Sequence, residues 1–304
     1  LIAQKIKSEK LTDTYQSYIQ DEQQYIRWYD REDHEHFDVC ADDHCQRYQG
    51  ISKAYMPFVR QAIEATRGEV LVYDGEICDA RFSKCCGGVT EHFENTWEPV
   101  KHSYLTKVVD SDTQSSTPDL SQEENARKWI LSIPDVFCNT RDKAILSNVL
   151  NDYDQETQDF FRWQVSYTPP ELSALITSRI GIDFGDIQSI EPVERGVSGR
   201  IIRLRIQGSK QDMIIGKELV IRKAFSQSHL YSSAFIVETA KDSSGAITRF
   251  TLKGAGWGHG VGLCQIGAAV MSAKGYDYKQ ILSHYFPGTQ LQTIENGELK
   301  MKKV

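Results

Sequence analysis

The sequence predicts an α+β fold: a single large mixed domain in which an antiparallel-rich sheet is interleaved with helices. Segments with the two-residue period of strands recur along the chain, for example at 160–167 and 201–206. Segments with the apolar spacing of helices lie between them, for example at 168–181. The two kinds of element do not alternate strictly as β-α-β units, which indicates the α+β class. With 304 residues, 40% of them hydrophobic, the chain can bury a substantial core.

The N-terminal third contains one predicted helix and one predicted hairpin. Residues 1–10 resemble the end of a helix, and we expect the start of that helix to lie upstream, because nucleation and capping precede it. A helix over 52–68 ends at Gly68, and a hairpin over 69–84 turns at Asp74-Gly75. The hairpin leads into Cys85-Cys86-Gly87-Gly88-Val89-Thr90-Glu91, a sharp loop that we expect to present a hydroxyl and a carboxylate.

The rest of the chain alternates between the two periodicities. The segment 111–118 is loop-like, and Ser121-x-x-Glu124 is a capping box at the start of a helix that ends before Pro134. The segment 195–200 is a glycine-containing turn between two strands. The remaining predicted helices are 137–150, 168–181 and 265–274, and the remaining strands are 160–167, 187–193, 201–206, 213–215, 234–239 and 247–252.

Composition excludes several classes of partner. The net charge of −7 and pI of about 5.7 argue against nucleic acid and anionic lipid as partners. No run of about 18 apolar residues is present, so we expect no transmembrane segment. The seven cysteines are an odd number with uneven spacing, which leaves their pairing and the redox compartment open.

A glycine-rich stretch, 254–262, is the most distinctive local feature. Five glycines in nine residues are too many for the interior of a helix or strand, so we expect close backbone approach, either to a ligand or to another strand. Trp257, His259 and Gln265 supply an indole, an imidazole and an amide in and just after this loop. The glycine spacing fits neither the dinucleotide fingerprint nor the P-loop, so phosphate binding is disfavoured.

The segment 34–45 combines thiols and imidazoles. Two cysteines and three histidines within twelve residues are chemistry suited to a tetrahedral zinc ion. The alternatives are a Cys40–Cys45 disulfide, or two free buried thiols. A zinc hydrolase centred on this cluster is a third hypothesis for function. No organic cofactor is expected.

Three motifs together resemble the SpoIID/LytB family, named for stage II sporulation protein D and the LytB amidase enhancer. They are Gly256-Trp257-Gly258-His259-Gly260-Val261-Gly262-Leu263-Cys264-Gln265-Ile266-Gly267-Ala268 with its continuation over 275–289, Cys86-Gly87-Gly88-Val89-Thr90-Glu91, and His44-Cys45-Gln46-Arg47-Tyr48-Gln49-Gly50. The resemblance implies one domain over 1–304, with an N-terminal lobe (1–110), a middle α+β portion (111–235) and a C-terminal part (236–304). The N-terminal part of the family domain is expected to be missing.

The resemblance also implies a function in the cell envelope, outside the cytoplasm. SpoIID-like proteins are lytic transglycosylases that cut peptidoglycan glycan strands after N-acetylmuramic acid and leave 1,6-anhydro ends. The alternative is a non-catalytic peptidoglycan-binding module that enhances a cell-wall amidase. The family's catalytic Glu precedes the segment at which this chain begins, so the main acid is expected upstream. Glu91 is the one carboxylate within the motifs that could stand in for it.

If the three motif loops converge, they line a groove suited to a polyhydroxylated polymer, with aromatic faces, amides and hydroxyls. The predicted substrate-binding residues are Gln46, Tyr48, Thr90, Trp257, His259 and Gln265. Some family members hold a structural zinc near 34–45. Carried over by position, its ligands would be His34, Cys40, His44 and Cys45, with His36 as a substitute for His34. Four protein ligands leave no open position for water, which favours a structural ion.

Overall fold

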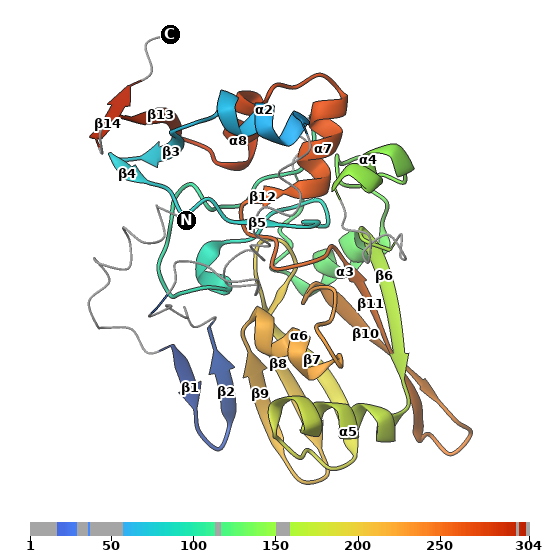
Figure 1. The fold of residues 1–304 in the computed structure, drawn as a ribbon. Helices are drawn as coiled ribbons and strands as arrows, with labels where there is room; N and C mark the ends of the chain where they lie inside the picture. Colours follow the sequence, from blue (N-terminus) through green and yellow to red (C-terminus); the bar gives the residue numbers. More distant parts are fainter. Residues whose placement is uncertain are drawn as a thin grey trace. The chain divides into compact units, whose positions relative to one another are not determined.

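The computed structural model describes residues 17–28, 36, 57–112, 117–149, 159–295 and 298–301. It confirms the α+β class, with helices and mainly antiparallel strands interleaved along the chain (Figure 1). The predicted helix over 1–10 lies outside the described residues. Among the residues that are described, no helix has both the length and the apolar character needed to cross a bilayer.

The chain divides into two compact units. In the described residues, the first unit comprises residue 36, 57–80, 288–295 and 298–301, and the second comprises 17–28 and the described parts of 81–287. The single domain in three consecutive portions stays a prediction beside this division.

The first unit contains a four-stranded sheet and a short helix. The strand order is β14-β13-β3-β4, with bounds Glu298–Met301, Gln290–Glu295, Glu69–Tyr73 and Glu76–Ile77, and the helix is α2, Pro57–Ala65. The predicted hairpin turn is confirmed: Asp74 and Gly75 have φ of 50° and 81°. Two consecutive left-handed residues are typical of the type I′ turn that matches strand twist.

Two sheets frame the second unit. The five-stranded sheet has the order β1-β2-β9-β8-β7, with bounds Tyr18–Gln20, Gln24–Arg27, Asp212–Gly216, Ile201–Gly208 and Ile187–Arg195. The three-stranded sheet has the order β10-β11-β6, with bounds Phe235–Lys241, Ile247–Ala255 and Arg162–Tyr167. A short parallel pair joins β5, Phe82–Ser83, to β12, Leu263–Cys264. The strands from β6 to β11 agree with the sequence prediction, whereas β1 and β2 were not predicted.

Helices pack on these sheets in the second unit (Figure 1). Their bounds are α3 Glu123–Leu131, α4 Lys143–Val149, α5 Pro169–Ile180, α6 Glu218–Ala224, α7 Gln265–Ala273 and α8 Tyr278–Tyr285. The main core lies where α5 and α6 meet both sheets, and Leu172, Leu204, Ile221 and Leu252 are buried in it. Because this core draws on every part of 163–252, it fixes the middle of the unit as one body.

Two helix starts differ from the sequence prediction. The helix predicted from Ser121 begins at Glu123, because the Ser121 amide and hydroxyl both bond Asp119 Oδ1 (3.1 and 2.7 Å) instead of capping. The helix predicted over 137–150 begins at Lys143 as α4. Its expected first residues are held in turns, since the amide of Phe137 donates to the Asp110 carbonyl at 2.6 Å.

Candidate functional site

The two motif loops that the structure describes lie against each other. Cys85 and Trp257 form an antiparallel bridge, with amide-to-carbonyl bonds of 3.0 and 2.8 Å in the two directions. Glu91 and Val261 form a parallel bridge, and the Glu91 amide donates to the Gly260 carbonyl at 2.9 Å. The predicted convergence of the loops near residues 90 and 260 is therefore confirmed.

The glycines of this junction are used for close approach to the protein's own chain. Gly256 has φ of +77°, and a Cβ there would lie 2.8 Å from the Cys85 carbonyl oxygen. A Cβ at Gly260, where φ is +76°, would overlap the Arg200 guanidinium. Of the two uses that the sequence left open, these glycines serve backbone-to-backbone contact and the seating of a buried arginine.

Glu91 is 1% exposed, and both of its carboxylate oxygens accept hydrogen bonds from the chain. Oε1 accepts from the His92 amide (2.9 Å), the Asn95 side-chain amide (2.8 Å) and the Val197 amide (3.2 Å). Oε2 accepts from the amide (3.1 Å) and hydroxyl (2.6 Å) of Ser198. This geometry is typical of a structural carboxylate, the alternative weighed in the sequence, and a catalytic role for Glu91 stays a prediction.

Thr90 also turns inward, so the loop does not present its hydroxyl as expected. Its Oγ1 donates to the Thr106 carbonyl at 2.7 Å and accepts from the Val108 amide at 2.7 Å, and the residue is fully buried. The inward orientation follows from the neighbouring strand-like segment, which supplies both partners. Substrate binding by Thr90 stays a prediction.

Trp257 and Gln265 lie at the partly exposed edge of the junction. The indole stacks on Phe160 with ring centroids 5.0 Å apart, meets Tyr231 edge-on at 4.7 Å, and lies under the Lys84 ammonium at 4.3 Å. Trp257 is thus held in one orientation by its neighbours. Gln265 is the first residue of α7.

His259 is a neutral imidazole with a fixed tautomer. Its Nδ1 accepts from the Val261 amide at 3.0 Å, so the ring proton is on Nε2, and the ring meets Trp97 edge-on at 5.0 Å. Burial, followed by the positive charges of Arg81 and Arg200, lowers the pKa of His259 well below its ordinary 6.5. At neutral pH this ring is a hydrogen-bond donor rather than a cation.

Arg200 ties the junction together and was not singled out from the sequence, which marked 195–200 only as a turn. It is 1% exposed, and its guanidinium donates to the carbonyls of Cys86 (3.1 Å) and Gly258 (3.0 Å). It also donates to the Ser198 hydroxyl at 3.0 Å, which in turn donates to Glu91. A buried arginine beside a glycine turn was the available signal.

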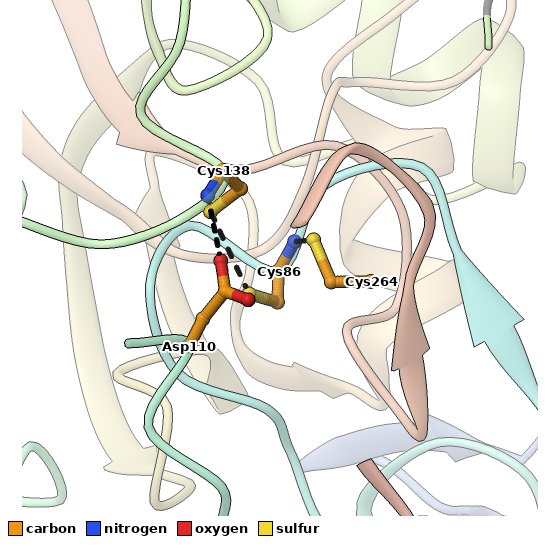
Figure 2. Close-up of side chains that lie close together, drawn as sticks. All are labelled: Cys86, Asp110, Cys138 and Cys264. Carbon is orange, nitrogen blue, oxygen red and sulfur yellow. Dashed lines mark hydrogen bonds between the residues drawn. The ribbon is translucent and has the colours of Figure 1, made fainter. Parts of the chain in front are cut away.

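Four buried acidic side chains gather beside the junction: Cys86, Asp110, Cys138 and Cys264 (Figure 2). Their ligand atoms all lie within 4.8 Å of one another, so the cluster could hold a metal ion. The Sγ atoms of Cys86 and Cys138 are 3.7 Å apart, and the Cys86 amide donates to Cys264 Sγ at 3.2 Å. None of these three cysteines forms a disulfide.

The sequence analysis interpreted Cys85 and Cys86 as small packing residues, and for Cys86 this needs correction. Both cysteines are buried, but Cys86 contributes its thiol to the cluster. The signal that could have found the cluster is that Cys86 and Cys264 each lie inside a family motif. The spacing to Cys138 and Asp110 gave no such indication.

The predicted zinc ligands His34, Cys40, His44 and Cys45 lie outside the described residues, as do Gln46 and Tyr48. His36, the substitute ligand, is described and exposed. The zinc site in this segment, and the third motif loop of the groove, therefore stay predictions.

Comparison with family models matches residues 12–73 to "Stage II sporulation protein" and residues 91–262, more than half of the chain, to "Domain of unknown function (DUF8618)". Among curated proteins, the chain is 27% identical over 242 residues to "Amidase enhancer" of Bacillus subtilis, covering 76% of this chain and 32% of that protein. It is 29% identical over 255 residues to an uncharacterised protein of Brachyspira hyodysenteriae, covering 84% of this chain and 54% of that protein.

The chain thus spans about a third and about half of the length of these two relatives. The motif junction has the residues that the resemblance identified, and the family models cover both sides of it. This chain belongs to the SpoIID/LytB-like family, and its segment 91–262 to the DUF8618 family.

Proposed function

We propose that this chain acts at the bacterial cell wall, outside the cytoplasm, by binding the glycan strands of peptidoglycan. The observation that supports the proposal best is the junction of the two motif loops, because it leaves an indole and an amide partly exposed on a rigid base. Trp257 is fixed by Phe160 and Tyr231, and Gln265 follows directly after the glycine-rich loop. Indole faces and side-chain amides are suited to sugar rings and their hydroxyls.

Co-sedimentation of the chain with purified peptidoglycan sacculi tests this proposal. Gln265→Ala and Trp257→Ala are expected to weaken binding at least several-fold. The matched control is Phe58→Ala, which removes an exposed aromatic ring (66% exposed) on α2 of the first unit. Equal binding by the native chain, Gln265→Ala and Trp257→Ala, each with an unchanged circular dichroism spectrum, would contradict the proposal.

The finer form of the proposal is lytic transglycosylation by the complete protein. Cleavage needs a carboxyl that first protonates the glycosidic oxygen and then accepts the proton of the sugar's 6-hydroxyl. The Glu91 oxygens already accept five hydrogen bonds, so we assign that acid to a Glu upstream of this chain. Mass spectrometry should detect 1,6-anhydro ends released by the complete protein, and loss of the upstream Glu should abolish them.

Amidase enhancement is the second candidate. The name of the Bacillus subtilis relative favours it, and so does the structural use of Glu91. The partner would then be a cell-wall amidase, and the chain would contribute binding without turnover. The discriminating measurement is the rate of stem-peptide release by a purified amidase with and without the chain. An increase in that rate without anhydro products supports enhancement over cleavage.

The segment 34–45 enters the proposal as a structural zinc site with His34, Cys40, His44 and Cys45 as ligands. A structural ion predicts that chelation lowers the melting temperature, whereas a hydrolytic zinc predicts loss of activity without unfolding. Thermal unfolding with and without chelator, combined with elemental analysis, separates the two.

A further inference from the structure

The cluster of Cys86, Asp110, Cys138 and Cys264 has the dimensions of a tetrahedral metal site. A zinc–sulfur distance of about 2.3 Å gives a tetrahedron with sulfur–sulfur edges of about 3.8 Å. The Cys86 and Cys138 sulfurs are 3.7 Å apart, and the four ligand atoms stay within 4.8 Å of one another. A disulfide, by contrast, needs sulfurs about 2.0 Å apart.

Hydrogen bonds already orient these side chains from outside the cluster, as is usual around metal ligands. The Cys86 amide donates to Cys264 Sγ at 3.2 Å, and the Gly88 amide donates to Cys86 Sγ at 3.4 Å. Asp110 accepts from the Cys138 amide at 2.8 Å and from the Tyr285 hydroxyl. Each carboxylate oxygen of Asp110 therefore has one donor from the chain and a further lone pair for another partner.

The charge of the cluster also calls for a cation. Three thiols and a carboxyl are each 2% exposed or less, so burial raises the pKa of Cys86 and Cys138, and burial followed by the charge of Cys264 raises the pKa of Asp110 to about 8. The nearby Arg162 guanidinium uses its donors on backbone carbonyls such as that of Gly87. A divalent ion is what lets such groups be deprotonated together in a buried site.

We infer that Cys86, Asp110, Cys138 and Cys264 bind one thiophilic divalent cation, preferentially Zn²⁺, as a structural site. Three sulfurs and one carboxylate oxygen complete a four-coordinate shell, and its burial leaves no position for water or substrate. This site is separate from the one predicted over 34–45, since the two share no residue. It does not depend on which cell-wall function is correct.

Such an ion would fasten segments that are far apart in the chain. Cys86 belongs to the first motif loop and Cys264 to the second, while Asp110 and Cys138 lie in the loops that flank α3. A cross-link between distant segments removes loop entropy from the unfolded chain, so its effect on stability is expected to be large. The ion would hold the two motif loops together from the side opposite in sequence to Arg200.

The test uses the full chain carrying Cys40→Ser and Cys45→Ser, so that zinc bound by the segment 34–45 does not contribute. Elemental analysis after purification with added ZnCl₂ is expected to find about one zinc per chain. Adding Cys264→Ser or Cys138→Ser should reduce zinc below about a tenth of that value, and chelation should lower the melting temperature. Cys85→Ser is the matched control, since Cys85 is equally buried but outside the ligand set, and it should keep its zinc.

Cobalt substitution gives a second readout that does not require the serine variants to fold. Co²⁺ in the Cys40→Ser/Cys45→Ser chain should show thiolate-to-cobalt absorption with an intensity corresponding to three thiolates, together with the strong visible bands of a tetrahedral site. A zinc-free chain without that absorption would overturn the inference. So would peptide mapping that finds a Cys86–Cys138 disulfide, or loss of zinc from Cys85→Ser with retention by Cys264→Ser.

Discussion

Replacing Glu91 by Gln is expected to destabilise the protein strongly, because this carboxylate satisfies buried donors. Gln keeps one acceptor oxygen and places an NH₂ group where the other oxygen was. If the NH₂ lies at the Oε2 position, the amide and hydroxyl of Ser198 lose their acceptor. If it lies at the Oε1 position, the donors of His92, Asn95 and Val197 do. At about 1–3 kcal/mol per unsatisfied donor, two lost acceptor contacts lower the free energy of unfolding by about 2–6 kcal/mol.

Urea unfolding followed by tryptophan fluorescence measures this loss in the relevant part of the chain. The second unit contains all the tryptophans, which are Trp28, Trp97, Trp129, Trp163 and Trp257. The signal therefore reports the unit that contains Glu91, and a lower midpoint at unchanged slope gives the change in free energy.

Glu124→Gln is the control, because Glu124 is 73% exposed and pairs with Lys128 at 3.0 Å on the surface of α3. Its removal should change the free energy of unfolding by less than about 0.5 kcal/mol. If Glu91→Gln kept the native urea midpoint but stopped glycan cleavage, the structural assignment of Glu91 would be refuted and its catalytic role supported.

Three further predictions use the same unit. Gly254→Ala should cost about 3 kcal/mol and shift the fluorescence to the red, because the added Cβ would overlap the Trp163 indole; an unchanged midpoint would contradict this. His259 takes up a proton below about pH 6.5 only when unfolded, so its contribution to stability is full above that pH and is lost as pH falls; its ring signal in NMR should not titrate between pH 7.5 and 6. Glu123→Gln should cost about 2 kcal/mol in urea although Glu123 is 53% exposed, because it leaves the buried Arg195 charge unpaired; a cost near zero would show that the carbonyls around Arg195 suffice.

Local signals predicted the elements whose causes are local. The Thr168 hydroxyl and Glu171 carboxylate at the start of α5 form a capping box, and Asp74-Gly75 adopts the left-handed turn expected of it. Both patterns depend on residues within four positions of each other, so the sequence contains their full physical cause.

Long-range pairing is where the sequence prediction was incomplete. Tyr25 in β2 pairs in parallel with Ile215 in β9, so the β1–β2 hairpin owes its place in the sheet to a strand much later in the chain. The hairpin itself is short and mostly exposed, which gives no strong alternation of apolar and polar residues. Strands of this kind are specified by the edge they join rather than by their own pattern.

The candidate site was predictable in composition but not in orientation. The sequence indicated that the loops near residues 90 and 260 meet, yet the inward turn of Thr90 and Glu91 depends on partners at 106–108 and 197–198. The metal-capable cluster shows the same limit, because its four residues come from separate loops and no spacing rule connects them.

The turn 195–200 explains why the motif loops form a preorganised surface. Ser198 donates to Glu91 in the first loop, while Arg200 donates to the Cys86 carbonyl in the first loop and the Gly258 carbonyl in the second. A planar guanidinium can bridge two backbones at once, whereas a lysine ammonium offers no such fixed fork. Because these donors are buried, the loops keep their relative position without a ligand, and binding there does not have to order them. A glycan strand would then meet a surface whose shape is set mainly by Arg200, a residue that the strand itself need not touch.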